Sequence, residues 1–208
     1  MQHLKAAFIF VILILLTGAA LGARGAEDVR LSAEALAEKL KQYETIDSLE
    51  ATFKQSKRFK DLTIELKSDG RIKLERKKRI VVWEVLRPSP LKATLLQDEL
   101  RLESGEGASR VEQTIKTANV GKKAASGLTM LVAWLELDAV RLSKDYDVAR
   151  AADGRFLFTP KAKQENPFER LEMWLDSKGF MSKLKVLETS GDQFQIEFSA
   201  PKITRAQK

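Results

Sequence analysis

Residues 62–83, LTIELKSDGRIKLERKKRIVVW, constrain the fold most because apolar and polar residues alternate along them. The apolar positions with this spacing are Leu62, Ile64, Leu66, Ile72 and Leu74. Since the side chains of a strand point alternately to opposite faces, the pattern predicts a β-hairpin with one apolar face and a turn at Ser68-Asp69-Gly70. The same parity reaches Arg76, so an extended strand would direct a cation toward the apolar side. Such a face suits a container for an amphiphile better than a catalytic surface.

The same period of two recurs through most of the chain. It predicts strands at residues 48–55, 80–86, 91–96, 99–103, 146–149, 155–159, 171–175, 180–187 and 194–198, and it leaves 111–117 open between a strand and a lead-in. Short turns such as Asp153-Gly154 and Gly191-Asp192 make consecutive strands antiparallel neighbours. We therefore predict one α+β domain with a single large curved antiparallel sheet, an unclosed β-barrel of about ten or eleven strands.

Two segments change to the three-to-four spacing of a helix. Ser32 is the expected N-cap of an amphipathic helix at residues 33–43, and residues 127–138 predict a second, strongly apolar helix. The inner face of the sheet is the large apolar surface available to cover them. Two or three helices are therefore expected as a lid or plug over a hydrophobic cavity.

The chain opens like a secretory signal peptide. Lys5 precedes an apolar run at residues 6–16, and small residues follow. We expect a signal peptide at residues 1–23, cleaved within 20–26, and a mature domain at 27–208. A permanent membrane anchor is the alternative, but the apolar core is short for a span and no basic cluster follows it. The signal peptide predicts a soluble product in the periplasm, which we expect to be a monomer. Because cysteine is absent, neither a lipid anchor nor disulfides are expected.

Basic residues concentrate in one sector of the chain. There are 36 Lys and Arg against 29 Asp and Glu, and residues 57–92 alone contain 12 basic and 5 acidic side chains. A basic sector on a nearly neutral body favours docking to something acidic, such as lipid headgroups or a partner protein. Nucleic acid is not expected as a partner, because aromatic residues do not interleave with the basic run as a stacking platform needs.

The usual catalytic residues are missing from the mature chain. The only histidine is His3 and there is no cysteine, which excludes Ser-His-Asp and Cys-His machinery and the common zinc and copper ligands. No glycine-rich phosphate loop is present. Acidic pairs such as Asp98/Glu99 and Asp145/Asp147 fit solvated turns better than glycosidase or calcium sites. We expect neither an enzyme nor a bound metal or cofactor.

Three segments resemble, in order, motifs of the LolA family, the periplasmic carriers of outer-membrane lipoproteins. They are LEATFKQ at residues 49–55, GRIKLER at 70–76 followed by Trp83-Glu84, and FLFTPK at 156–161. The short helix before the first strand and a leader without a lipobox are also similar to the family. The resemblance implies an unclosed β-barrel with a helical lid over a hydrophobic cavity that takes acyl chains.

The resemblance also implies partners and a switch residue. An inner-membrane ABC-type complex would release lipoproteins to the carrier, which passes them to an outer-membrane receptor or membrane surface. The family's functional arginine maps onto Arg76, which would act on the lid through hydrogen bonds. Lys77 stands where the family has proline and the spacing to Trp83 is longer, so Arg79 is the alternative. The alternative for Arg76 is that it is an ordinary solvated residue of the basic run without a switching role.

The side chains expected to line the acyl-chain cavity lie on the apolar face of the sheet or on the helices. They are Leu36, Leu40, Phe53, Ile64, Leu66, Ile72, Leu74, Trp83, Leu131, Trp134, Leu135, Phe156, Phe158, Trp174 and Phe198. Ordinary core packing is the alternative for each of them, so the prediction concerns the set.

Three functions remain open from the sequence. The leading one is a periplasmic carrier that shields lipoprotein acyl chains in its cavity and shuttles them to the outer membrane. The same half-barrel also suits a carrier of another amphiphile, or a sensor or protein-interaction domain whose interior is filled by its own side chains. A hydrolase of lipid or glycan is the third, and the lack of histidine and cysteine argues against it.

Overall fold

The computed structural model describes residues 28–62, 64–96, 98–105, 109–116, 137–162 and 166–205. Its strands are β1 (Val29–Arg30), β2 (Ile46–Arg58), β3 (Glu65–Glu75), β4 (Ile80–Arg87), β5 (Leu91–Leu95), β6 (Glu99–Ser104), β7 (Val111–Lys116), β8 (Tyr146–Arg150), β9 (Phe156–Pro160), β10 (Phe168–Leu175), β11 (Met181–Glu188) and β12 (Gln193–Arg205). The helices within this part of the chain are α2 (Ala33–Glu44) and α4 (Ala139–Asp145).

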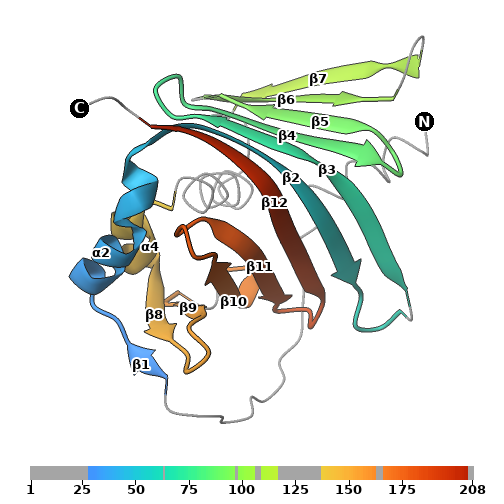
Figure 1. Cartoon of the computed structure of the whole chain (residues 1–208). Helices are drawn as coiled ribbons and strands as arrows, with labels where there is room; N and C mark the ends of the chain where they lie inside the picture. Colours follow the sequence, from blue (N-terminus) through green and yellow to red (C-terminus); the bar gives the residue numbers. More distant parts are fainter. Residues whose placement is uncertain are drawn as a thin grey trace.

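All of these strands belong to one twelve-stranded sheet in the order β1-β8-β9-β10-β11-β12-β2-β3-β4-β5-β6-β7. Every neighbouring pair is antiparallel. The sheet curves strongly, and its two ends, β1 and β7, lie far apart (Figure 1). The predicted fold class is confirmed, with more strands than the expected ten or so because β1 was not predicted and residues 111–116 do form a strand.

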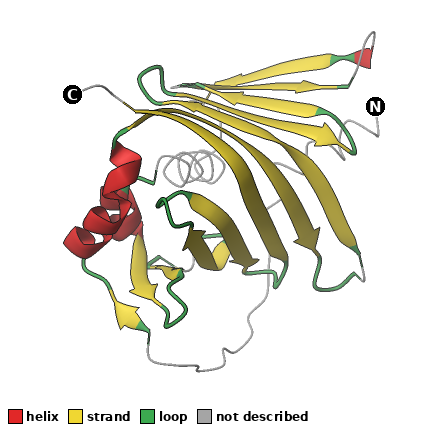
Figure 2. Ribbon diagram, in the orientation of Figure 1, coloured by secondary structure: helices red, strands yellow, loops and turns green. Residues whose placement is uncertain are grey.

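The two helices lie next to each other in the opening of the curved sheet (Figure 2). Helix α2 begins at the predicted N-cap, where the Ser32 side chain accepts a hydrogen bond from the backbone N–H of Ala35 at 3.2 Å. Its buried side chains, Leu36, Leu40 and Tyr43, form one stripe. The amphipathic pattern of residues 33–43 therefore predicted both the helix and the face that it buries.

The second predicted helix, at residues 127–138, lies almost entirely outside the described residues. Its last two positions are not helical. Leu137 is a buried turn residue, and the Asp138 side chain caps α4 by accepting hydrogen bonds from the backbone N–H groups of Val140 and Arg141, each at 3.1 Å. Helix α4 was not predicted, because its seven residues are too few for a periodic pattern to stand out.

Burial alternates along the central strands as the period of two requires. On β2, Leu49, Ala51 and Phe53 are buried, and the residues between them are exposed. The buried positions face the concave side of the sheet and join the core under the helices. The sheet thus has an apolar inner face and a charged outer face, which is the arrangement that the sequence pattern predicts.

The predicted hairpin within residues 62–75 is wrong. Strand β3 runs unbroken from Glu65 to Glu75, and Ser68-Asp69-Gly70 lies inside it. Gly70 is paired with Phe53 of β2, and a Cβ atom at Gly70 would lie 2.7 Å from Cζ of the Phe53 ring. Glycine is needed here because the backbone carbonyl of Glu84 and the Phe53 ring both approach this position closely, not because the chain turns.

We expect Gly70→Ala to destabilise the protein. The added methyl group has to displace both the Phe53 ring and the backbone of Glu84, so the free energy of unfolding should fall by about 3 kcal/mol, the upper end of the cost of overpacking. Urea denaturation measures this. Lys67→Ala, on the exposed face of the same strand, is the matched control and should change the free energy by less than about 0.5 kcal/mol. A Gly70→Ala variant as stable as the control would contradict the proposed role of the glycine.

Candidate functional site

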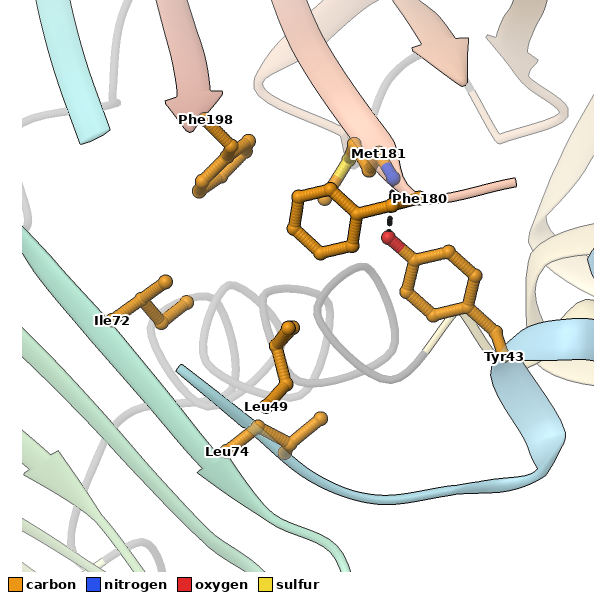
Figure 3. Close-up of a pocket in the computed structure, with 7 residues that line it drawn as sticks. All are labelled: Tyr43, Leu49, Ile72, Leu74, Phe180, Met181 and Phe198. Carbon is orange, nitrogen blue, oxygen red and sulfur yellow. Dashed lines mark hydrogen bonds between the residues drawn. The ribbon is translucent and has the colours of Figure 1, made fainter. Parts of the chain in front are cut away.

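A small apolar pocket lies between α2 and the concave face of the sheet. Seven side chains from helix and sheet line it: Tyr43, Leu49, Ile72, Leu74, Phe180, Met181 and Phe198 (Figure 3). Its volume is about 10 Å³, close to the space of a single water-sized sphere. Pockets that hold a small ligand usually have about 300–1,000 Å³. Among the described residues this pocket is therefore a close contact between helix and sheet, too small by itself for an acyl chain.

Tyr43, in the last turn of α2, connects the helix to the far side of the pocket. Its hydroxyl oxygen accepts a hydrogen bond from the backbone N–H of Met181, at the start of β11 (Figure 3). Its ring stacks on Phe180 with centroids 6.1 Å apart. Burial raises the pKa of the Tyr43 hydroxyl well above its ordinary value, so the phenol stays protonated. The contact combines apolar packing with one buried polar bond.

Aromatic rings continue this contact across the concave face. Phe180 meets Phe198 edge to face at 6.4 Å between centroids, and Phe198 meets Trp83 in the same manner at 6.4 Å. Trp83 in turn stacks on Phe53 with centroids 4.2 Å apart. The row runs from α2 to β4 and crosses β12 and β2. It offers a continuous apolar wall directly behind the helix.

Arg76 follows β3 and anchors the C-terminal end of α2. Its Nε donates to the backbone carbonyl of Ile46, and its Nη2 donates to the carbonyl of Tyr43, each at 2.9 Å. The last carbonyls of a helix have no partner within the helix and carry partial negative charge, so a guanidinium suits them well. Lys77 adds a 3.0 Å ion pair with Asp47 beside it.

The alternative residue, Arg79, lies elsewhere. It is exposed in the turn between β3 and β4, with a positive φ of 53°. The structure thus brings Arg76, and not Arg79, to the carbonyl of Tyr43 near the end of α2 and to the carbonyl of Ile46 at the start of β2. The parity argument from the sequence predicted this direction, because Arg76 continues the buried series of Ile72 and Leu74. Whether Arg76 acts as a switch stays a prediction.

The predicted cavity residues fall into distinct groups. Ile72, Leu74 and Phe198 line the pocket. Others are buried in the core that surrounds it: Leu36, Leu40, Phe53, Phe156 and Phe158. Trp83 is half-buried against that core, and Leu66 is half-buried near the start of β3. Leu131, Trp134 and Leu135 lie outside the described residues. The role of the set in holding acyl chains stays a prediction.

Two of the predicted residues do not face the cavity. Trp174 lies on the opposite face of β10 from buried Leu171 and Met173, and its ring is flanked by the Arg155 guanidinium at 5.8 Å and the Lys183 ammonium at 5.2 Å. The alternation of β10 already indicated this side. Ile64 precedes β3 and is 51% exposed, because the strand begins only at Glu65.

Sequence reasoning missed four of the residues that line the pocket. Tyr43 was recognised only as part of the helical stripe, and Leu49 only as part of a strand. Phe180 and Met181 follow the Lys178-Gly179 turn. Their meeting with Tyr43 depends on a contact across 138 positions of the chain, for which periodicity carries no signal.

The basic sector of residues 57–92 is largely neutralised in the structure. Eight of its cations form ion pairs with carboxylates: Lys57, Lys67, Arg71, Lys73, Lys77, Lys78, Arg87 and Lys92. Several of these pairs run across neighbouring strands on the outer face, as between Arg71 and Glu84. Local charge pairing therefore explains much of the excess, and docking to an acidic surface stays a prediction.

One of these ion pairs lies on the inner side of the sheet. Lys57 continues the buried parity of Phe53 and Gln55, and its Nζ is 2.9 Å from Oε1 of Glu188. Both side chains are mostly buried. Burial raises the pKa of Glu188, and the hydrogen bond from Lys57 opposes that rise. The pair stands at the end of β2 remote from α2 (Figure 1).

The described residues show two further absences. Among them, no group of three or more His, Cys, Asp or Glu side chains gathers in a way that could hold a metal ion. None of the helices in the same part of the chain is both long and apolar enough to cross a membrane.

The fold and pocket define a half-barrel with an apolar concave face, against which α2 packs through Tyr43. A family profile described as "Outer membrane lipoprotein carrier protein LolA" matches residues 44–208, and the chain belongs to this family. No curated protein matches the sequence significantly. The family is one of carriers and is not a catalytic one.

Solved structures with a similar course of the chain share 10% sequence identity with it. A DUF1329 family protein from Desulfovibrio piger has a TM-score of 0.46, with 85% of this chain and 93% of that chain covered. A LolA superfamily protein from Nitrosomonas europaea has a TM-score of 0.41, with 85% and 96% covered. The lipoprotein LppX from Mycobacterium tuberculosis has a TM-score of 0.43, with 81% and 95% covered.

We expect Tyr43→Phe to loosen the end of α2. The change removes the acceptor of the Met181 N–H and leaves a buried donor unpaired, which costs about 1–3 kcal/mol. Hydrogen exchange should therefore show a faster Met181 amide, together with a lower thermal midpoint. Lys41→Gln, on the exposed side of the same helix, should leave both values unchanged. Equal protection of the Met181 amide in wild type and Tyr43→Phe would contradict the role given to this bond.

Proposed function

We propose that the protein is a periplasmic carrier that shields the acyl chains of lipoproteins against the concave face of its sheet. Membership of the LolA family supports the class of carrier. The apolar wall behind α2 supports an acyl chain as the bound group. In this proposal the closed pocket is the empty state, and α2 moves away when the cargo enters.

The observation that carries the proposal is the way α2 is held. Tyr43, at the C-terminal end of α2, packs on the aromatic row through Phe180, and polar bonds to Arg76 and Met181 fix that end. Apolar packing alone would not fix the position of α2 on the sheet, and many hydrogen bonds along the helix would prevent it from moving away. Hydrogen bonds that are concentrated at one end suit a helix that rotates about that end when a ligand binds.

Simple energetics make such a carrier reversible. An acyl chain that leaves water gains about 0.8 kcal/mol per methylene group, so a long chain supplies several times the cost of breaking the bonds at α2. When the chain leaves, the same stripe of Leu36, Leu40 and Tyr43 covers the wall again. The covering helix thus recovers part of the apolar burial that the departing cargo gives up.

The route of the cargo follows from the family. We propose that residues 1–23 direct export to the periplasm, that an inner-membrane ABC-type complex loads the carrier, and that an outer-membrane receptor or membrane surface receives the lipoprotein. The apolar run near the start of the chain supports the first step. Catalysis has no part in this proposal.

Direct binding tests the proposal. Residues 27–208, purified and delipidated, should bind a fluorescent sixteen-carbon fatty acyl probe with saturable stoichiometry close to one, and mass spectrometry of protein purified from the periplasm should find an acylated molecule attached. A protein that binds no probe and carries no acylated molecule would contradict it.

We expect Arg76→Leu to release the end of α2. Hydrogen bonds from a charged donor are worth about 1.5–3 kcal/mol, so amides in the last turn of α2 should exchange about 10- to 100-fold faster, and the acyl probe should enter faster. Arg79→Leu is the matched control, because it removes the same charge from an exposed turn that lies three positions further along the chain. Equal effects of the two substitutions would contradict a specific role for Arg76.

A second function is favoured by the small size of the pocket. This pocket leaves about 10 Å³ among the described side chains between α2 and the sheet, and such close packing also suits a sensor or protein-interaction domain with a filled interior. The two functions differ in one result. A carrier takes up the probe and its α2 amides lose protection, whereas a filled domain excludes the probe and keeps them protected.

A further inference from the structure

Strand β7 forms the outermost strand at one end of the sheet. It pairs with β6 over Val111–Lys116, and within the described residues no strand pairs with its other side. Five of its six side chains are exposed, and only Ile115 is half-buried. Figure 1 shows β7 at the outer margin of the sheet, away from α2 and α4. The other edge strand, β1, has only two residues.

A free edge of this length can accept another strand. Half of the backbone N–H and C=O groups of β7 point away from β6, and such a row is a template for pairing with a further chain. Charged side chains on an edge discourage unspecific pairing, so the charges of β7 determine which strand fits. Those charges are Glu112 and Lys116, which lie on the same face of the strand.

The charge of Glu112 is poorly balanced in the single chain. Its direct partner on β6 is Glu103, and like charges opposite each other in a ladder repel. Arg110 bridges both carboxylates, with its Nη2 3.0 Å from Oε1 of Glu112. Glu103 also pairs with Lys92 at 3.2 Å. Glu112 has only its share of Arg110 among the ion pairs of the described residues, so a further cation beyond the edge would be attracted to Glu112.

A second copy of β7 supplies that cation. When two β7 strands run antiparallel with Thr114 opposite Thr114 of the other copy, each Glu112 stands opposite the other copy's Lys116. The register therefore gives two opposite-charge pairs and one threonine pair on one face, all of them favourable cross-strand contacts. The charges of β7 are therefore self-complementary about Thr114.

We propose that the protein forms a homodimer in which the β7 edges of two copies pair about a two-fold axis at Thr114, so that one sheet continues across both chains. Such an interface is isologous, since the same strand contributes both sides. It involves one short strand from each copy and belongs to the small interface class. The dimer is therefore concentration-dependent, in contrast to the monomer that we expected from the sequence, and it leaves the opening at α2 free.

Sedimentation equilibrium of residues 27–208, from micromolar to millimolar concentration, tests the proposal. The wild-type mass should rise toward twice the monomer mass with concentration, and added salt should weaken the association. Glu112→Lys places lysine opposite Lys116 and should weaken dimerisation at least 10-fold. Lys116→Glu should do the same. The double variant Glu112→Lys/Lys116→Glu restores opposite pairs and should recover most of the affinity.

Matched controls separate pairing from net charge and folding. Glu169→Lys and Lys178→Glu change the charge equally at exposed positions on other strands and turns and should leave dimerisation unchanged. Circular dichroism and thermal midpoints establish that each variant is folded. A wild-type protein that stays monomeric at every concentration overturns the proposal, and so does a dimer that the single charge reversals do not weaken. The acyl-probe result does not enter this test.

Discussion

The hydrogen bonds that the Arg76 guanidinium donates, to the carbonyl of Tyr43 in α2 and to the carbonyl of Ile46 at the start of β2, tie the end of the helix to the sheet. The strands supply an apolar concave wall, and α2 contributes its apolar stripe to the same buried core. Apolar packing alone fixes neither the direction nor the depth of a covering helix, because it is not directional. Arg76 and the Tyr43–Met181 bond provide that direction at one end of α2.

The placement of Arg76 follows from the strand that precedes it. The alternation of Ile72 and Leu74 on β3 carries the arginine to the inner side of the sheet, and α2 ends where its guanidinium arrives. Gly70, further back on the same strand, lets the Phe53 ring cross and stack on Trp83. One strand therefore organises both the aromatic wall and the residue that holds the lid.

Local pattern was enough to predict the sheet, α2 with its cap at Ser32, and the inward direction of Arg76, because each depends on a few neighbouring residues. The local pattern failed where long-range contacts determine the conformation or the neighbours of a residue. Ser68-Asp69-Gly70 has the composition of a turn, but the ring of Phe53 requires the glycine within a strand. Phe180 and Met181 became pocket residues only through their long-range contact with Tyr43, and the wrong side was assigned to Trp174 although its own strand's alternation indicated the outer face.

The central claim is that α2 leaves the concave wall when an acyl chain enters. The chain contains no cysteine, so spin labels can be attached to single cysteines introduced at exposed Lys39 of α2 and exposed Lys54 of β2. Pulsed electron spin resonance then measures the distance between the two labels with and without a bound fatty acid. The account predicts that the distance distribution shifts when the ligand is bound and returns when it is removed. An unchanged distribution in a protein shown to be saturated with ligand would contradict it.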